Sequence, residues 1–370
     1  MTSGSTPENK ASRFPFGNDP AKVDRYLAFW SRAHTRRPLV GFSLLGWFPF
    51  EAFSVCRSWP KDGDLLPSMV DPQEFLADYQ RVLAEGDRLD DDVLRGACPA
   101  QGAIPWLSGM VGARLRILPD SVLGQEMNLD WDSALSVRLD PTSPWVAKYL
   151  QFLDVLVEFA AGRFPVSHSP EIGPTDLHAL LRGHTQAILD LELEPERAER
   201  LLWRCAEVFA EFFRLSWERL PRFCGGYFDA QYGLWAPGSI ARLQEDASAV
   251  LSPRLYRKFV QPVDRWLARQ FDYPLIHLHS TSMFLLEAVL EIEEIRCIQI
   301  NRDAVGWPLE RLLPYFQQVQ RAGRPLLIRG EFTPNELKQL LDALEPRGLF
   351  LQILVRSESE VEGLRLALGW

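Results

Sequence analysis

The sequence predicts an α/β fold, a (β/α)8 TIM barrel with an N-terminal helical extension. Short β-like runs alternate with longer amphipathic helical stretches along most of the chain, and this alternation is typical of a parallel sheet. About eight such runs are present, and the last four strand–helix units follow one another without interruption, which favours a closed barrel over an open sheet. No GxGxxG motif follows the first run, so the sequence disfavours a dinucleotide-binding fold.

The predicted strands are short apolar runs such as the first one, PLVGFSL. In chain order they span 38–44, 92–98, 164–167, 227–231 or 240–244, 274–279, 295–301, 325–330 and 349–356. The predicted helices span 72–85, 195–219, 254–270, 283–291, 308–321 and 334–344. Start signals support two of them, because Ser252-Pro253 and Thr333-Pro334 each combine a capping residue with a proline in the first turn. Glu336 completes a capping box with Thr333.

Length and composition narrow the class of protein. A chain of 370 residues exceeds the usual size of one simple core, so either two domains or one large barrel is expected. We interpret residues 1–20 as a disordered leader, because they hold no apolar stretch that could serve as a secretion signal, and residues 21–370 as a single barrel domain. No apolar run approaches the roughly 20 residues of a membrane helix, so we expect no membrane partner.

The number and spacing of the cysteines indicate the redox compartment of the protein, and the distribution of charge indicates which partners it can bind. The five cysteines are scattered without a close pair, which fits a reducing compartment and predicts a cytoplasmic protein. The net charge is −9, and the basic residues are dispersed rather than gathered into a stripe, so we expect no nucleic-acid partner. An anionic ligand would have to be held by a few local arginines.

Four segments resemble one known family when they are taken together and in order. They are EIGPTDLHALLRG from residue 171, LQEDASAVLSPRLYRKFVQP from residue 243, IHLHS from residue 276 and GEFTP from residue 330. This order and spacing resembles the uroporphyrinogen decarboxylase superfamily, which also contains the cobalamin-linked methyltransferases that feed coenzyme M. The resemblance covers about residues 163–370 and implies a barrel enzyme with a small-molecule substrate.

Several residues that define the decarboxylases are replaced. Their arginine-rich loop after the first strand is here Leu-Gly-Trp-Phe at 45–48, and their aspartate after the second strand has no counterpart at 96–99. A family tyrosine corresponds to Leu180, a strand serine to Asp246, and the late histidine is missing from 355–357. The resemblance therefore implies a methyltransferase-like enzyme. The alternatives are a decarboxylase-type lyase acting on a carboxylated tetrapyrrole and a ligand-binding relative without catalysis.

Two histidines form the main candidate site. Working residues of such barrels lie at the carboxyl ends of the strands, and His277 and His279, two apart, share one strand face there. The resemblance implies zinc at this position, where methyltransferase relatives carry His, Cys and a later Cys. Because residue 279 is His and no cysteine follows Cys297, a zinc set here would comprise His277, His279 and a carboxylate such as Glu331. Alternatively, both histidines hydrogen-bond a ligand without metal.

Polar residues at other strand ends extend the candidate site. Asp246 is a third candidate catalytic residue, as a general base or as the group that orients an imidazole, although it could equally cap the chain. Gln244 shares the strand face of Asp246. Gln299 and Asn301 end the next strand but one on a common face.

Two arginines and several aromatic residues complete the predicted substrate-binding set. Arg329 and Arg356 follow late strands and could receive a carboxylate or phosphate, or else form ion pairs at the rim. A mouth lined by flat rings would suit a planar or sugar-like ligand, although each ring alone could equally pack a loop. The aromatic candidates are Trp47, Phe48, Trp106, Tyr232, Trp235 and Trp307. The resemblance further implies a corrinoid protein as partner and pairing of two barrels into a homodimer.

Overall fold

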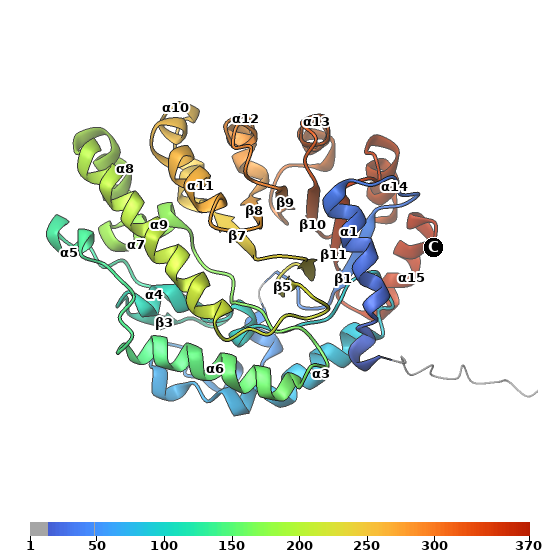
Figure 1. The fold of residues 1–370 in the computed structure, drawn as a ribbon, viewed down its shortest axis with the longest axis horizontal. Coiled ribbons are helices and arrows are strands. Elements are labelled where there is room, and N and C mark those ends of the chain that lie inside the picture. Colours follow the sequence, from blue (N-terminus) through green and yellow to red (C-terminus); the bar gives the residue numbers. More distant parts are fainter. Residues whose placement is uncertain (1–13, 48) are drawn as a thin grey trace, which may run out of the picture.

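The computed structural model describes residues 14–47 and 49–370. Its centre is a six-stranded parallel sheet with the spatial order β1–β11–β10–β9–β8–β7 (Figure 1). The strands are β1 (Leu39–Ser43), β7 (Ile240–Gln244), β8 (Tyr273–Leu278), β9 (Cys297–Arg302), β10 (Leu326–Gly330) and β11 (Leu349–Leu354). Almost all of their side chains are buried, as expected for a parallel sheet with packed layers on both faces.

These six strands confirm six of the predicted ones, with ends displaced by at most two residues. Of the two alternatives after residue 220, the run at 240–244 belongs to the sheet. The other contains β5 (Tyr227–Asp229), which pairs antiparallel with β6 (Leu234–Ala236) in a separate hairpin. A small antiparallel sheet is formed by β2 (Gly63–Leu65), β3 (Leu115–Ile117) and β4 (Val122–Gly124).

The predicted strands at 92–98 and 164–167 are not regular strands; they are extended segments joined by one parallel bridge. The physical reason lies beside β1. There the carboxylates of Asp91 and Asp92 accept backbone N–H groups of β1 at 2.6 and 3.0 Å and so replace strand carbonyls. On the far side, Nε2 of His168 bonds to a β7 carbonyl at 3.1 Å. A continuous series of contacts therefore runs from β1 through both segments to β7.

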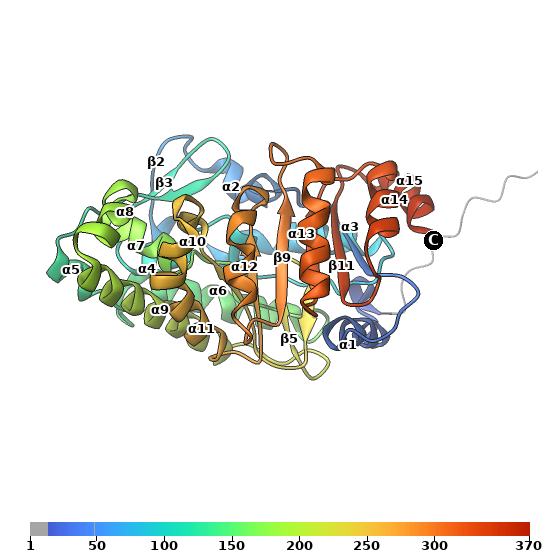
Figure 2. The ribbon, with the colours of Figure 1, turned by 90° about the horizontal axis from the view of Figure 1, so that it is seen from above.

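Helices cover the outside of the central sheet (Figures 1 and 2). The helices predicted at 195–219, 308–321 and 334–344 are confirmed as α9 (Pro195–Trp217), α13 (Leu309–Arg321) and α14 (Pro334–Ala343). The expected capping box opens α14, with reciprocal bonds between Thr333 and Glu336. The other helices are α1 (Val23–Ser31), α2 (Ser54–Ser58), α4 (Trp106–Met110), α5 (Trp131–Leu135), α6 (Pro144–Ala160), α7 (Pro174–Arg182), α8 (His184–Leu193) and α15 (Glu358–Leu368).

One predicted helix is interrupted, and two others begin as 3₁₀ turns. The segment 254–270 contains α10 (Pro253–Leu255), a π-helical turn at Tyr256–Val260 and α11 (Gln261–Ala268). Pro262 explains the break, because proline has no N–H to continue the α-helical bonding pattern. The segments 72–85 and 283–291 each begin as 3₁₀ turns before α3 (Leu76–Asp87) and α12 (Leu286–Leu290).

The β5–β6 hairpin lies within the curve of the sheet rather than outside it (Figure 1). The turn that joins its strands, residues 230–233, is bonded from several sides. Gln352 of β11 donates to the carbonyl of Gln231 at 2.7 Å, and the hydroxyl of Tyr26 in α1 donates to the carbonyl of Gly233 at 2.7 Å. We call residues 227–236 the inserted hairpin.

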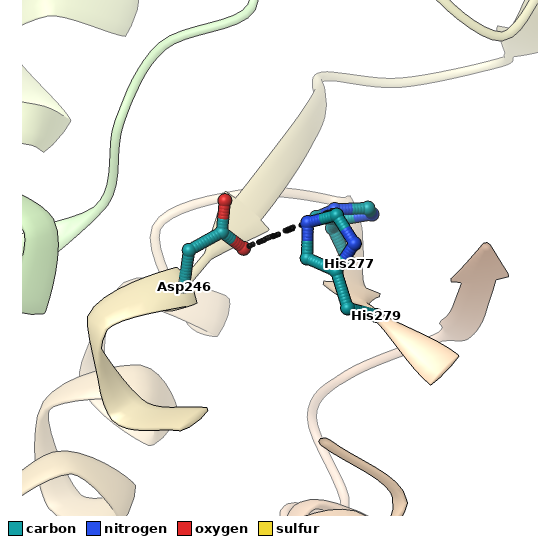
Figure 3. Close-up of side chains that lie close together, drawn as sticks. All are labelled: Asp246, His277 and His279. Atoms are coloured by element: carbon teal, nitrogen blue, oxygen red, sulfur yellow. Dashed lines mark hydrogen bonds and ion pairs between the residues drawn. The ribbon is translucent and has the colours of Figure 1, made fainter. Parts of the chain in front are cut away.

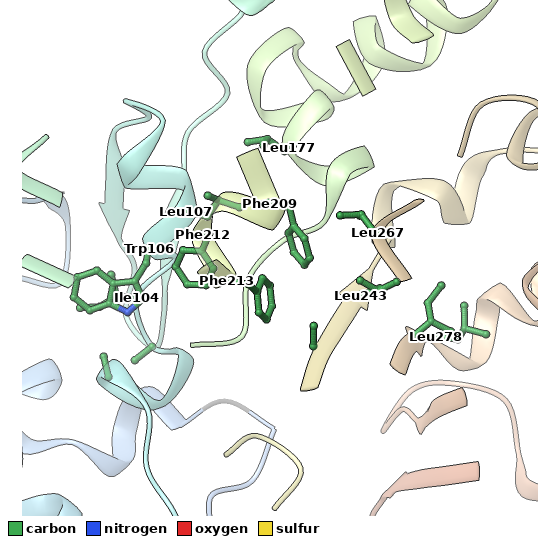
Figure 4. Close-up of a cluster of buried hydrophobic side chains, with 14 of the residues drawn as sticks. Ile104, Trp106, Leu107, Leu177, Phe209, Phe212, Phe213, Leu243, Leu267 and Leu278 are labelled. Atoms are coloured by element: carbon green, nitrogen blue, oxygen red, sulfur yellow. The ribbon is translucent and has the colours of Figure 1, made fainter. Parts of the chain in front are cut away.

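Aromatic side chains dominate the main apolar core. Phe209, Phe212 and Phe213 project from α9 into one cluster with Leu243 of β7 (Figure 4). The rings of Phe209 and Phe213 lie 4.9 Å apart between centroids. Burying a side chain of this size stabilises the fold by roughly 1.5–3 kcal/mol, so α9 is a major source of the energy that holds β7 in place.

The described part of the expected leader, residues 14–20, contacts the domain, while residues 1–13 lie outside the described residues. Phe16 is buried against Phe164 with ring centroids 5.7 Å apart. The side-chain amide of Asn18 donates to the carbonyls of Arg95 (3.0 Å) and Arg163 (3.1 Å). None of the helices in the described ranges combines the length and the apolar character needed to span a bilayer.

Candidate metal centre

His277, His279 and Asp246 converge at the carboxyl ends of β7 and β8 (Figure 3). The parallel pairing of these strands places Gln244 opposite His277, so Asp246 lies alongside the residues just beyond. The Nε2 atoms of the two histidines are 3.3 Å apart, and Oδ1 of Asp246 lies 3.9 Å from Nε2 of His277 and 3.6 Å from Nε2 of His279. The sequence prediction of these three residues as one site is consistent with this geometry.

Two of the three separations between these atoms, 3.3 and 3.6 Å, fit zinc, and the third, 3.9 Å, is slightly longer. Tetrahedral coordination with bonds of about 2.0–2.2 Å separates neighbouring ligand atoms by roughly 3.3–3.6 Å. Two imidazole nitrogens and one carboxylate oxygen are donors that zinc accepts, and three protein donors leave a fourth position open.

The other ring nitrogen of His277 faces an amide oxygen. Nδ1 of His277 bonds to Oε1 of Gln299, and Nε2 of Gln299 donates to Oδ1 of Asn301 at 2.9 Å. Because an amide oxygen can only accept, the proton of a neutral His277 ring sits on Nδ1. Its Nε2 therefore carries a lone pair directed at His279 and Asp246, as a metal ligand requires.

His279 is held by a carboxylate that the sequence analysis missed. Its Nδ1 donates to Oδ1 of Asp303 at 2.9 Å, and Oδ2 of Asp303 accepts from the backbone N–H (2.9 Å) and hydroxyl (2.7 Å) of Ser280. Asp303 continues the alternation of Gln299 and Asn301 by two residues, so the period of the strand could have identified it.

Burial and charge separate the two histidines. Hydrogen bonds to Asp246 and Asp303 raise the pKa of His279 to about 10, whereas burial lowers the pKa of His277 to about 4. Burial favours the neutral form of Asp246, but its hydrogen bond to His279 and the nearby imidazoles outweigh this effect and lower its pKa to about 2. Two carboxylates lie against one imidazolium here, and the buried guanidinium of Arg242 also acts on Asp246 and His277, so the charges around the centre are nearly balanced.

A cavity of about 920 Å³ opens beside the centre. Five of the predicted substrate-binding residues line it, namely Trp47, Gln244, Asn301, Arg329 and Arg356. Gln299 lies beneath this surface and is fully buried. The amide of Gln244 donates to Asp246 at 2.5 Å, so this residue also supports the metal centre.

Glu331, the carboxylate expected as third ligand, is not brought to the histidines. It lies just beyond β10, and β9 separates that strand from β8, whereas β7 is the direct neighbour of β8. Its carboxylate pairs instead with Arg356 at 3.2 Å, with both side chains exposed. Asp246 takes the position expected for Glu331.

Trp235 is not brought to the cavity either. It is buried in β6, with its ring 6.2 Å from that of Tyr26 and its indole N–H donating to the carbonyl of Phe223. Trp106 packs in the core, Trp307 contacts Tyr315 with the two rings tilted by 45°, and Phe48 lies outside the described residues. Of the aromatic candidates, Trp47 and Tyr232 line the cavity, so the expected ring of flat side chains is not formed.

Two further cavity residues, Arg242 and Glu171, were not predicted, and a third, Tyr232, was predicted only as an aromatic side chain of the mouth. Arg242 precedes Gln244 and Asp246 on one strand face, an alternation that could have identified it. Glu171 is buried, and burial raises its pKa to about 8. Tyr232 reaches the site from the turn of the inserted hairpin, a position for which the strand pattern gives no signal.

Comparisons with known proteins give a structural likeness and no sequence relationship. No protein-family model matches the chain, and no curated protein matches it. Among solved structures, a methyltransferase from Methanosarcina mazei aligns with a TM-score of 0.65 over 94% of this chain and 98% of that chain, at 13% sequence identity. At this identity the likeness establishes that the two proteins share an α/β fold along almost their whole length.

Proposed function

We propose that the chain is a methyltransferase-like enzyme of the uroporphyrinogen decarboxylase superfamily that binds zinc and transfers a methyl group from a carrier to a small thiol, with loss of the thiol proton. The observation that carries the proposal is the convergence of Nε2 of His277, Nε2 of His279 and Oδ1 of Asp246 beside a large cavity. The shared fold with a methyltransferase from Methanosarcina mazei favours methyl transfer over other metal-assisted chemistry.

His277, His279 and Asp246 would hold the metal. A bound zinc supplies Lewis acidity, which converts a thiol to its thiolate at neutral pH. Gln299 and Asp303 keep the two imidazoles turned so that their Nε2 atoms meet. Asp246 would offset part of the positive charge of the zinc ion. The thiol of the substrate would bind on the side of the centre that has no protein ligand.

Two arginines define the opposite end of the substrate. Arg242 and Arg329 are buried and line the same cavity, and among the described residues neither has a carboxylate within ion-pair distance. The contacts of Arg329 are a hydrogen bond to the carbonyl of Gly46 at 2.8 Å and the ring of Trp47 at 4.8 Å. Burial lowers the pKa of Arg329 to about 10, so this poorly compensated cation favours a substrate that carries a carboxylate or a similar oxyanion. Asp229 and Asp246 offset part of the charge of Arg242, which would be a secondary partner of that group.

We also propose that the central sheet is closed into a barrel of eight positions. The extended segments at 92–98 and 164–168 would fill the two positions between β1 and β7. Support comes from the backbone bond between Asp92 and Val40 (3.1 Å), the bridge between Ala97 and Val166, and the bond of His168 to β7. The cavity would then be the carboxyl-end mouth of the barrel, where active sites of this fold lie.

The methyl carrier in this proposal is a corrinoid protein, as the sequence resemblance implies. Copurification of a corrinoid protein with the chain would support that partner. Release of carbon dioxide from a carboxylated tetrapyrrole in the absence of zinc would instead favour the lyase branch of the superfamily. Tight binding of a tetrapyrrole without turnover would favour a binding protein.

The zinc content of matched variants tests the proposal. We expect about one zinc per chain after dialysis of the wild type, and a large loss in His279→Ala and Asp246→Ala. Glu331→Ala is the matched control, because that carboxylate faces Arg356 and should leave the zinc content unchanged. Zinc retained in both ligand variants, with folding verified by circular dichroism, would contradict the proposal.

A further inference from the structure

The turn of the inserted hairpin is fixed from several directions at once. Besides the bonds from Gln352 and Tyr26, the N–H of Ala230 donates to Ser167 at 3.1 Å, and the amide of Gln101 donates to the carbonyl of Ala230 at 3.2 Å. These partners lie in parts of the chain far apart in sequence. The turn therefore occupies one defined position under the metal centre, and the side chain it carries there is set by the fold.

That side chain is Tyr232, which is 1% exposed. Its hydroxyl donates to Oε1 of Gln299 at 2.8 Å and lies 3.3 Å from Nδ1 of His277. A tyrosine hydroxyl carries its proton at neutral pH, so Tyr232 acts as a donor toward Gln299. Tyr232 therefore contacts the side-chain amide of Gln299, the group that determines which ring nitrogen of His277 carries the proton.

The orientation of the Gln299 amide decides which nitrogen of His277 holds the proton. With Oε1 toward the ring, Nδ1 must be the donor, and Nε2 is free for a metal. With the amide reversed, its NH₂ group would donate to Nδ1, and the ring proton would move to Nε2, where it would block coordination. The bond from Tyr232 to Oε1 and the bond from Nε2 to Asn301 both favour the first orientation.

We infer that Tyr232 is a positioning residue of the metal centre. The inserted hairpin places its hydroxyl against Gln299, and Gln299 in turn holds the proton of His277 on Nδ1. The part of this inference that concerns metal binding rests on the proposed function. The part that concerns the proton of His277 holds for the metal-free protein as well.

The test uses Tyr232→Phe, which removes one hydroxyl and leaves the ring. The matched control is Tyr149→Phe, because Tyr149 is equally buried and its hydroxyl bonds to Ser216 at 2.8 Å, away from the centre. The metal-free proteins, labelled with ¹⁵N-histidine, are compared by two-dimensional NMR, with His277 assigned through its loss in His277→Gln. Zinc affinity is then measured by competition with a chromogenic chelator.

We expect the wild type and Tyr149→Phe to show His277 as the Nδ1–H tautomer. Tyr232→Phe should show a second population with the proton on Nε2, and its zinc affinity should fall by about 10-fold or more, the usual effect of losing an outer partner of a metal ligand. Unchanged His277 signals, or an unchanged zinc affinity in Tyr232→Phe, would overturn the inference. A tautomer shift in a protein that binds no zinc even as wild type would uphold the effect on His277 and refute the proposed function.

Discussion

The side chains of the candidate metal centre come from alternate residues of three neighbouring strands, β7, β8 and β9. The series 242, 244, 246, then 277, 279, then 299, 301, 303 places polar side chains on the interior face near each carboxyl end. The period made His277, His279 and Asp246 predictable from the sequence. It could not decide between Asp246 and Glu331 as third ligand, because that choice depends on which strand lies beside β8 in space.

Glu171 gives the first prediction at this scale. Its buried carboxyl has a pKa of about 8, against an ordinary value of 4.5, and Oε2 accepts the N–H of Leu107 at 2.9 Å. Because the folded pKa is the higher one, its contribution to stability is complete below pH 4.5 and is lost as the pH rises toward 8. Over that range this group alone lowers the free energy of unfolding by up to about 1.4 kcal/mol per pH unit.

Glu171→Gln keeps the acceptor and removes the titration. We therefore expect the stability of the variant, relative to wild type, to increase steadily between pH 5 and pH 8. Urea unfolding at several pH values measures this difference. A difference that does not change with pH would show that Glu171 titrates normally.

The two buried cavity arginines, Arg242 and Arg329, give a second prediction. Zinc-loaded protein should bind 3-mercaptopropionate more tightly than 3-mercaptopropanol, because the carboxylate can reach Arg242 or Arg329. In Arg242→Gln the preference should fall by roughly 10-fold, the effect of losing a charge-assisted hydrogen bond of about 1.5 kcal/mol. Isothermal titration with both thiols measures it. An equal preference in wild type and variant would remove Arg242 from the substrate site.

At the scale of elements, local signals predicted most strands and helices well and failed where a side chain replaced backbone bonding. The carboxylates of Asp91 and Asp92 occupy the ladder positions of β1, so the segment 92–98 could not form a regular strand. The inserted hairpin escaped prediction for a different reason. Its sequence is typical of a strand, but its position within the curve of the central sheet follows from contacts with four distant segments.

The approach of α7 to β7 gives the prediction at this scale. A Cβ on Gly173 would lie 1.5 Å from the carbonyl oxygen of Gln244, so Gly173→Ala must push the helix start away from the strand end that precedes Asp246. We expect a loss of at least about 2 kcal/mol in the free energy of unfolding and a weaker zinc site.

Gly363→Ala in α15 is the control, since nothing lies within 4 Å of its added Cβ. It should be neutral or stabilise the helix by up to about 1 kcal/mol. Chemical denaturation of both variants measures the pair. A tolerated Gly173→Ala with unchanged zinc affinity would mean that α7 does not hold the strand end in place.

At the scale of the whole molecule, alternation of strands and helices was enough to predict the α/β class and the location of the site at the carboxyl ends of the strands. The cavity was predictable only in part. Trp47 and Arg329 were expected to bind substrate and line it, whereas Arg242, which meets them there from β7, was not expected. No local sequence pattern indicates that residues from these distant segments line one cavity, because they come together only when the sheet curves.

Anomalous diffraction at the zinc absorption edge, from crystals grown with equimolar zinc, tests the central claim most directly. We predict one strong peak about 2.0–2.2 Å from Nε2 of His277, Nε2 of His279 and a carboxylate oxygen of Asp246, with its fourth side open to the cavity. The absence of a peak at this position would contradict the assignment of this site as a metal centre. A peak beside the carboxylate of Glu331, near Arg356, would contradict it as well.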